Sequence, residues 1–129
     1  MVEEPAGSRE HAAELNSWVR GLLARVEDKW GVLILGVLAA GGLRYSELGR
    51  HLPGVSQRML TLSLRRLERD GLVTRTVTPV NPPQVDYALT EVGLSLHRTM
   101  LVLLGWAKDH EEYIHRSRER FDAEHRGTG

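Results

Sequence analysis

The side chains best suited to chemistry lie on one face of a helix predicted over residues 57–69. Apolar residues recur at helical spacing along this segment and define its buried side. The opposite side carries Gln57, Arg58, Thr61 and Arg65. Glutamine can pair with an adenine edge, arginine with a guanine edge, and a threonine methyl can pack against thymine. Taken alone, Gln57 and Arg58 are better explained as solvated surface, but the joint placement of these side chains on one face indicates base recognition in a DNA groove.

The segments around this helix predict a winged helix-turn-helix. Residues 45–52 form a short helix, and Ser56 follows a Pro-Gly turn at the position that caps the next helix. Alternating β-branched residues then predict a hairpin with strands over 72–80 and 84–89. In this fold the second helix enters the major groove, and the hairpin forms a wing along the DNA. We therefore add Ser56 to the DNA-binding residues, together with Arg75 on the wing.

The charge distribution supports a local nucleic-acid surface, although the whole chain has no net charge. Residues 44–85 carry seven arginines and three acidic residues, which gives a net charge of +4. The segments before and after this one each carry two more acidic than basic residues. A cationic centre between acidic flanks is an electrostatic footprint of DNA binding, and it is also within the range of ordinary charge fluctuation.

The composition predicts one globular domain in the cytoplasm. The chain has 129 residues, of which 41% are hydrophobic and 26% are charged. Cysteine is absent, which excludes disulfides, thiolate metal sites and thiol-based redox switches. No apolar run has the length of a membrane span, and the polar, acidic N-terminus is not a signal peptide. No phosphate-binding glycine loop, nucleophile elbow or metal-binding histidine motif is present, so we expect no enzyme, cofactor or metal.

Two helices outside the predicted DNA-binding part are expected to form a dimer interface. The fold class is mainly α with a small β-hairpin: a flexible tail over 1–10, a single winged-helix domain over 11–121 and a second tail over 122–129. Its dimerisation helices cover 11–27 and 90–121, and the second carries a coiled-coil-like apolar seam. The residues predicted at the interface are Leu15, Leu22, Met100, Leu103, Ala107 and Ile114.

Aromatic residues of the same helices could line a cavity between the subunits. These residues are Trp18, Trp106, His110 and Tyr113. A flat aromatic effector would suit such a cavity. Ordinary interface packing explains the same residues, and we favour that interpretation because tryptophan and tyrosine are enriched at interfaces.

Several stretches resemble the HxlR-type winged helix-turn-helix transcriptional regulators of the MarR-like superfamily. They include Asp28-Lys29-Trp30, Tyr45-Ser46-Glu47-Leu48, the run from Pro53 to Thr61, Asp70-Gly71-Leu72-Val73, and Val85 to Thr90 with Gly93. The resemblance covers roughly residues 22–107. It implies a bacterial homodimer that binds an inverted-repeat operator and pairs through its first and last helices. Several relatives sense electrophiles through an N-terminal cysteine, a mechanism that this cysteine-free chain cannot share.

The predicted function is therefore sequence-specific binding to double-stranded DNA by a homodimeric regulator, most simply a repressor. Two alternatives remain open. One is a winged-helix module for protein interaction or dimerisation that does not bind DNA. The other is a protein that binds a small ligand in the dimer cleft.

Overall fold

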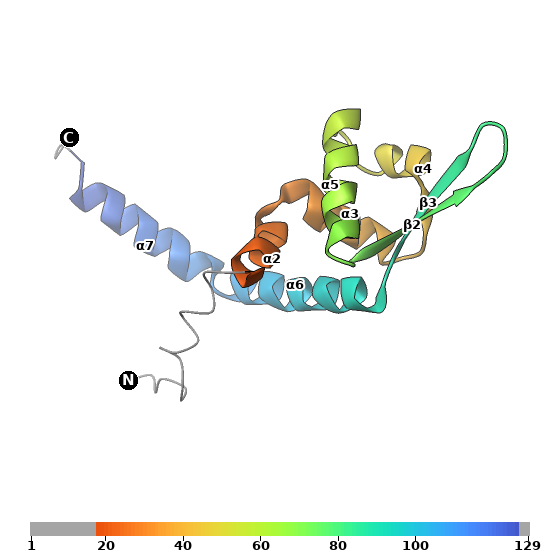
Figure 1. The fold of residues 1–129 in the computed structure, drawn as a ribbon. Helices are drawn as coiled ribbons and strands as arrows, with labels where there is room; N and C mark the ends of the chain where they lie inside the picture. The colour runs from red at the N-terminus through yellow and green to blue at the C-terminus, as the bar shows by residue number, and fades with distance from the viewer. Residues whose placement is uncertain (1–17, 127–129) are drawn as a thin grey trace. The chain divides into compact units, whose positions relative to one another are not determined.

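The structure, a computed structural model, describes residues 18–126 (Figure 1). Its helices are α2 (Trp18–Glu27), α3 (Lys29–Leu38), α4 (Tyr45–Arg50), α5 (Gln57–Arg69), α6 (Glu91–Asp109) and α7 (Glu111–Glu124). Its strands are β1 (Leu43–Arg44), β2 (Val73–Thr78) and β3 (Gln84–Leu89). The chain divides into two units, one up to His97 and one from Arg98. The mainly helical winged-helix prediction is confirmed for the first unit.

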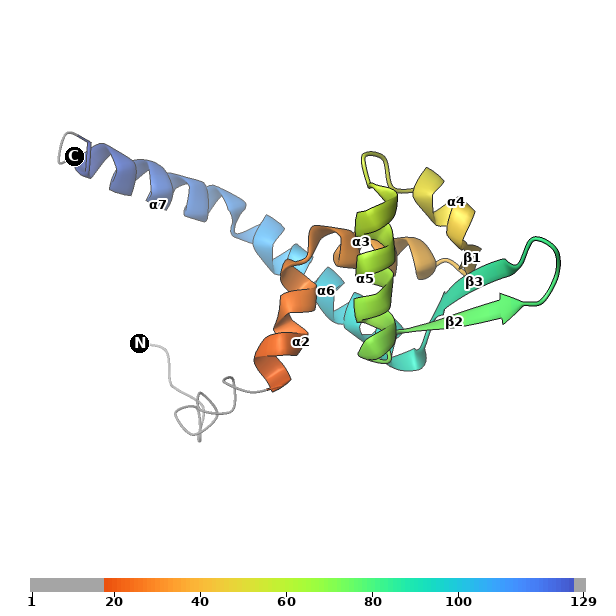
Figure 2. The ribbon, with the colours of Figure 1, turned by 45° about the horizontal axis from the view of Figure 1, so that its top comes forward.

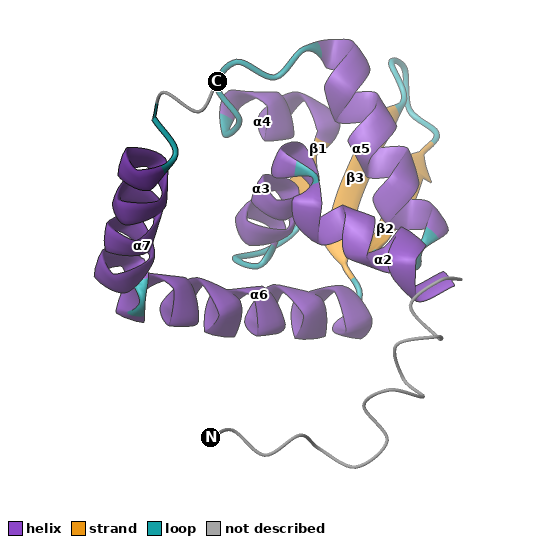
Figure 3. Cartoon of the chain, turned by 90° about the vertical axis from the view of Figure 1, so that its left-hand side faces the viewer, coloured by secondary structure: helices purple, strands orange, loops and turns teal. Residues whose placement is uncertain are grey.

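The three strands form one antiparallel sheet in the order β1–β3–β2 (Figure 3). The predicted hairpin is present as β2 and β3, which extend together away from the helices as a wing (Figure 2). Strand β1 was not predicted. It has only two residues, Leu43 and Arg44, which pair with Tyr87 and Asp86 of β3. A two-residue strand is too short to show a period, so its partner defines it rather than its own sequence.

The core of the first unit is made of aliphatic side chains from the helices and from the start of β2. Helix α3 contributes Ile34, Leu35 and Leu38 and packs against α5 and β3. The other buried aliphatic residues are Leu48, Leu52, Leu60, Leu64, Leu67, Leu72 and Val73. Leu60, Leu64 and Leu67 lie on one side of α5. Their burial leaves the opposite side of this helix free to face a ligand.

Helix α5 has the predicted bounds because both of its ends are encoded locally. Ser56 caps the start, where its Oγ accepts a hydrogen bond from the backbone N–H of Met59 at 3.1 Å. Gly71 follows the last turn with φ of +73°, a conformation that glycine adopts without strain. The N–H groups of Gly71 and Leu72 donate to the carbonyls of Glu68 and Leu67, which closes the helix C-terminus.

The start of α6 is tied to the turn between α5 and β2. Thr90 Oγ1 donates to the carbonyl of Gly71 at 2.7 Å and accepts from the N–H of Gly93 at 3.0 Å. The backbone N–H of Thr90 donates to the carbonyl of Leu72 at 3.1 Å. Gly93 is buried, and a Cβ at this position would stand 2.0 Å from the Leu72 oxygen. The first turn of α6 therefore packs backbone against backbone on the turn between α5 and β2.

The prediction of one continuous last helix over 90–121 is wrong. Helix α6 ends at Asp109, α7 begins at Glu111, and α7 continues to Glu124, into the segment predicted as a C-terminal tail. At the break, His110 Nδ1 lies 2.8 Å from the carbonyl oxygen of Trp106, and the two rings stack 4.5 Å apart. The His110 side chain thus competes for a carbonyl of the preceding turn. Glutamates in the first turn of α7 favour a new helix start there.

Some predictions fall on residues that the structure does not describe. The predicted helix over 11–27 is described from Trp18, and Leu15 lies outside the described residues, as does the predicted tail over 1–10. The single domain over 11–121 stays a prediction. Within residues 18–126, no helix has the length and apolar character needed to cross a membrane.

Candidate nucleic-acid interface

Helices α4 and α5 form the helix-turn-helix, and their connection is short. It runs from His51 to Ser56 and contains Gly54, whose φ of +88° again requires a conformation that glycine readily adopts. The N–H of Val55 donates to the carbonyl of Leu52 within this turn. Leu48 and Leu52 are buried, so the turn is anchored to the core from the α4 side.

The exposed side of α5 carries the side chains predicted to read bases. Gln57, Arg58 and Arg65 are exposed, whereas Thr61 is half-buried. The buried side consists of Leu60, Ser63, Leu64 and Leu67. Because Ser56 fixes the first turn, these polar residues occupy the N-terminal part of the helix, which is the part that enters a major groove.

A groove of about 920 Å³ runs between α5 and the wing. It brings together three of the predicted residues, Thr61 and Arg65 from α5 and Arg75 from β2. Its other charged lining residues are Arg44 and Glu68, so arginines outnumber carboxylates by three to one. A cationic concave surface beside a recognition helix has the charge and the position for a DNA backbone segment.

The remaining predicted DNA-binding residues lie outside this groove. Ser56 and Gln57 border a second, smaller hollow of about 210 Å³ with Tyr45 and Gly49. Arg58 lines neither hollow and is exposed on the first turn of α5. The predicted site therefore extends from the N-terminal turn of α5, where Gln57 and Arg58 are exposed, into the groove, where Thr61 and Arg65 of α5 are joined by Arg75 of the wing.

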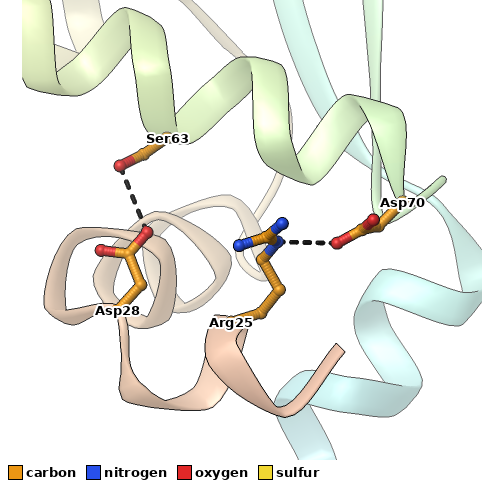
Figure 4. A network of polar contacts seen from close by, with 4 residues as sticks. All are labelled: Arg25, Asp28, Ser63 and Asp70. Atoms are coloured by element: carbon orange, nitrogen blue, oxygen red, sulfur yellow. Dashed lines mark hydrogen bonds and ion pairs between the residues drawn. The ribbon is translucent and has the colours of Figure 1, made fainter. Parts of the chain in front are cut away.

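Polar contacts join α5 and its C-terminal end to α2 and to the start of α3 (Figure 4). Arg25 Nε of α2 donates to Asp70 Oδ2 at 2.7 Å, and both side chains are largely buried. Asp28 caps α3 by accepting from the N–H of Trp30, and its other oxygen accepts from Ser63 Oγ at 3.4 Å. Ser63 is fully buried, so this contact satisfies a hydroxyl inside the α3–α5 interface. These contacts fix α5 against α2 and the start of α3.

We expect Asp70→Ala to lower the free energy of unfolding by about 1–3 kcal/mol, because it leaves the largely buried Arg25 guanidinium without its carboxylate. Arg69→Ala, one residue earlier and exposed, should change stability by no more than about 0.5 kcal/mol. Denaturant unfolding measures both values. In the double variant Arg25→Ala/Asp70→Ala the loss should be smaller than the sum of the single losses. Strict additivity would show that the ion pair contributes nothing.

Comparison with known proteins assigns the family. The family model for the HxlR-like helix-turn-helix matches residues 25–115. An uncharacterized HTH-type transcriptional regulator of Methanothermobacter thermautotrophicus is 44% identical over 95 residues, which cover 74% of this chain and 72% of the relative. The chain belongs to the HxlR-like helix-turn-helix family. It is therefore a transcriptional regulator with a DNA-binding fold, and not an enzyme.

Solved structures of other regulators share the fold. One, from Enterococcus faecalis V583 and assigned to the MarR family, has a TM-score of 0.67 at 34% identity. That match covers 78% of this chain and 92% of the other. The redox regulator HypR in its reduced form has a TM-score of 0.66 at 36% identity, over 78% of this chain and 99% of HypR. Because this HxlR-like chain has no cysteine, it cannot respond to oxidants through a thiol.

Two residues that line the groove of this HxlR-like protein were missed by the sequence reasoning. Arg44 lies in β1 and Tyr45 opens α4. Arg44 belonged to the cationic segment over 44–85, but without β1 nothing placed it beside the wing. The Tyr45 hydroxyl lies 2.9 Å from Thr61 Oγ1. That contact joins residues 16 positions apart, and no local pattern in the sequence predicts it.

The residues predicted to line an effector pocket are mostly exposed. Trp18 is 74% exposed, Trp106 54% and Tyr113 68%. Trp106 and His110 lie together as a stacked pair on adjacent turns. The pocket and its aromatic effector stay predictions, as does the alternative that these residues pack at an interface.

The residues predicted at the dimer interface are exposed or half-buried within one chain. Leu103 and Ala107 are exposed, whereas Leu22, Met100 and Ile114 are half-buried. Their exposure leaves apolar surface that a partner could cover.

Proposed function

We propose that this HxlR-like protein binds an inverted-repeat DNA operator as a homodimer in the cytoplasm and represses the promoter that contains the operator. The observation that carries the proposal is the polar N-terminal face of α5 beside the arginine-lined groove. In this arrangement Gln57 and Arg58 read base edges. Arg65 continues this face into the groove, where Arg75 of the wing contacts the DNA backbone. Repression follows because the occupied promoter excludes the polymerase.

The second unit supports the homodimer. Consecutive large apolar residues of α6 are exposed, and they are Leu101, Val102, Leu103 and Leu104. A monomeric protein rarely leaves such a patch in water. A twofold dimer formed through α6 would present two α5 helices to successive major grooves, on the order of 34 Å apart.

Selection of bound duplexes from a random DNA library, at two salt concentrations, tests the proposal. We expect an inverted repeat with half-site centres about one helical turn apart. We also expect that, between the two salt concentrations, the affinity for the selected site falls less than the affinity for random DNA. An enriched motif without internal symmetry would contradict the dimer. No enriched motif, with binding that vanishes at the higher salt, would favour the protein-interaction module or the ligand-binding protein.

We expect Arg58→Ala to relax the base preference at one base pair of each half-site by about 1–3 kcal/mol, because arginine pairs bidentately with guanine. Arg65→Ala should act in the same way at another position. Selection with each variant measures the change. If both variants keep the wild-type preference at every position, direct reading by α5 is wrong.

Arg75→Ala provides the contrasting result. Because a phosphate contact carries no sequence information, this variant should weaken binding to all sequences alike and lower the salt slope by about 1. A titration of the selected operator and of one scrambled duplex, each at several salt concentrations, measures both quantities. A loss of preference at one base pair would instead place Arg75 against a base edge in the minor groove.

A further inference from the structure

Tyr45 connects three elements of the DNA-binding unit at a single point. It is the first residue of α4, and its ring lies against that of Tyr87 in β3 at a centroid distance of 6.5 Å and an angle of 48°. Its hydroxyl reaches the first two turns of α5, at 2.9 Å from Thr61 Oγ1 and 3.3 Å from the carbonyl oxygen of Gln57. Tyr87 is buried, so the Tyr45 ring rests on a fixed support.

The hydrogen bonds of this cluster restrict the Thr61 side chain. A tyrosine hydroxyl has one proton to donate and can also accept. If Tyr45 donates to the Gln57 carbonyl, Thr61 must donate to Tyr45, and in the reverse case Tyr45 donates to Thr61. In both arrangements the Thr61 hydroxyl is held toward α4.

Holding the hydroxyl also fixes the methyl group. In a helix, threonine divides between two χ1 rotamers because its hydroxyl can bond to carbonyls of the preceding turn. A fixed partner for Oγ1 selects one rotamer, and the methyl carbon then has a single position. Thr61 lines the groove between α5 and the wing, so with its hydroxyl bonded to Tyr45 its methyl group is the part of the side chain left for contact with DNA.

We propose that Tyr45 is a positioning residue for base recognition: it holds the Thr61 hydroxyl so that the Thr61 methyl group reads the methyl of a thymine. The inference rests on the proposed function, because it requires α5 to lie in the major groove. Tyr45 acts through Thr61 and sets a preference at one base pair of each half-site. A role in packing alone would affect stability and overall affinity without changing the response to a thymine methyl.

Replacement of each operator thymine by deoxyuridine, one at a time, tests the proposal because it removes only the C5 methyl. We expect wild-type binding to weaken about fourfold at one thymine of each half-site, the value of one buried methyl group. Thr61→Ser keeps the hydroxyl and lacks the methyl, so it should lose this sensitivity at the same thymine. Tyr45→Phe keeps the ring beside Tyr87 and lacks the hydroxyl, so it should reduce the sensitivity there and leave the other thymines unchanged.

Thr61→Val separates positioning from a general loss of structure. Valine carries a methyl in place of the hydroxyl, so it offers Tyr45 no group to hold. The sensitivity of the Thr61→Val variant to deoxyuridine should therefore be the same whether residue 45 is tyrosine or phenylalanine. Wild-type binding that is indifferent to every deoxyuridine, or a Tyr45→Phe variant with unchanged sensitivity, overturns the inference while the proposed function stands. If the wild-type protein selects no operator, both are overturned.

Discussion

Replacement of Gly93 by alanine is expected to lower the free energy of unfolding by about 3 kcal/mol, at the upper end of the cost of overpacking a core position. The new Cβ would stand 2.0 Å from the carbonyl oxygen of Leu72 and 3.0 Å from its carbonyl carbon. Both are backbone atoms, so no side chain can turn away. Moving α6 outward would break the hydrogen bonds that join Thr90 to Gly71 and Leu72. A fall in melting temperature of roughly 10 °C follows for a domain of this size.

Gly49→Ala is the matched control. Gly49 also lies within a helix of the first unit, but nothing stands within 4 Å of the position of its added Cβ. Alanine in a helix is more favourable than glycine by up to about 1 kcal/mol, so this variant should be neutral or slightly more stable. Opposite signs for the two substitutions would confirm that close approach, not helix propensity, explains Gly93. A neutral Gly93→Ala would show that α6 does not pack on Leu72 in solution.

Elements with local signals at both ends could be predicted from the sequence. Helix α5 is the clearest case, because Ser56 and Gly71 mark its ends and its apolar spacing defines one face. Thr90 marks the start of α6 in the same way. The end of α6 could not be predicted, since the apolar seam continues past His110 without a break in its period. The break depends on how His110 contacts Trp106, which is a property of side-chain geometry.

Contacts between distant segments set the limit of the sequence reasoning. The ion pair between Arg25 and Asp70 joins residues 45 apart, and the Asp28–Ser63 contact joins residues 35 apart. A charge pattern cannot select such partners, because any of several arginines could have paired with Asp70. The exposed polar face of α5 was predictable since it needs only one helix. The groove was not, because it needs the wing and β1 in their folded positions.

Leu103→Glu is expected to convert the protein to a monomer and to weaken operator binding by roughly 100-fold or more, since the two half-sites would no longer be bound together. Leu103 is 53% exposed in the single chain, and Leu101, Val102 and Leu104 around it are about as exposed or more so. A glutamate in the centre of this patch would have to be buried as an unpaired charge for the dimer to form. Sedimentation velocity measures the dimer, and titration of the full operator measures the affinity.

Binding to a single half-site and a conservative substitution of Leu103 show whether the loss of operator affinity is caused by loss of the dimer. Leu103 is remote in sequence from α5. The Leu103→Glu monomer should therefore bind an isolated half-site with the same weak affinity as one wild-type subunit does. Leu103→Met preserves apolar character and volume, so it should keep both the dimer and the operator affinity. A Leu103→Glu protein that remains a dimer of unchanged strength would move the interface to another surface. A monomer with undiminished operator affinity would contradict the twofold binding mode itself.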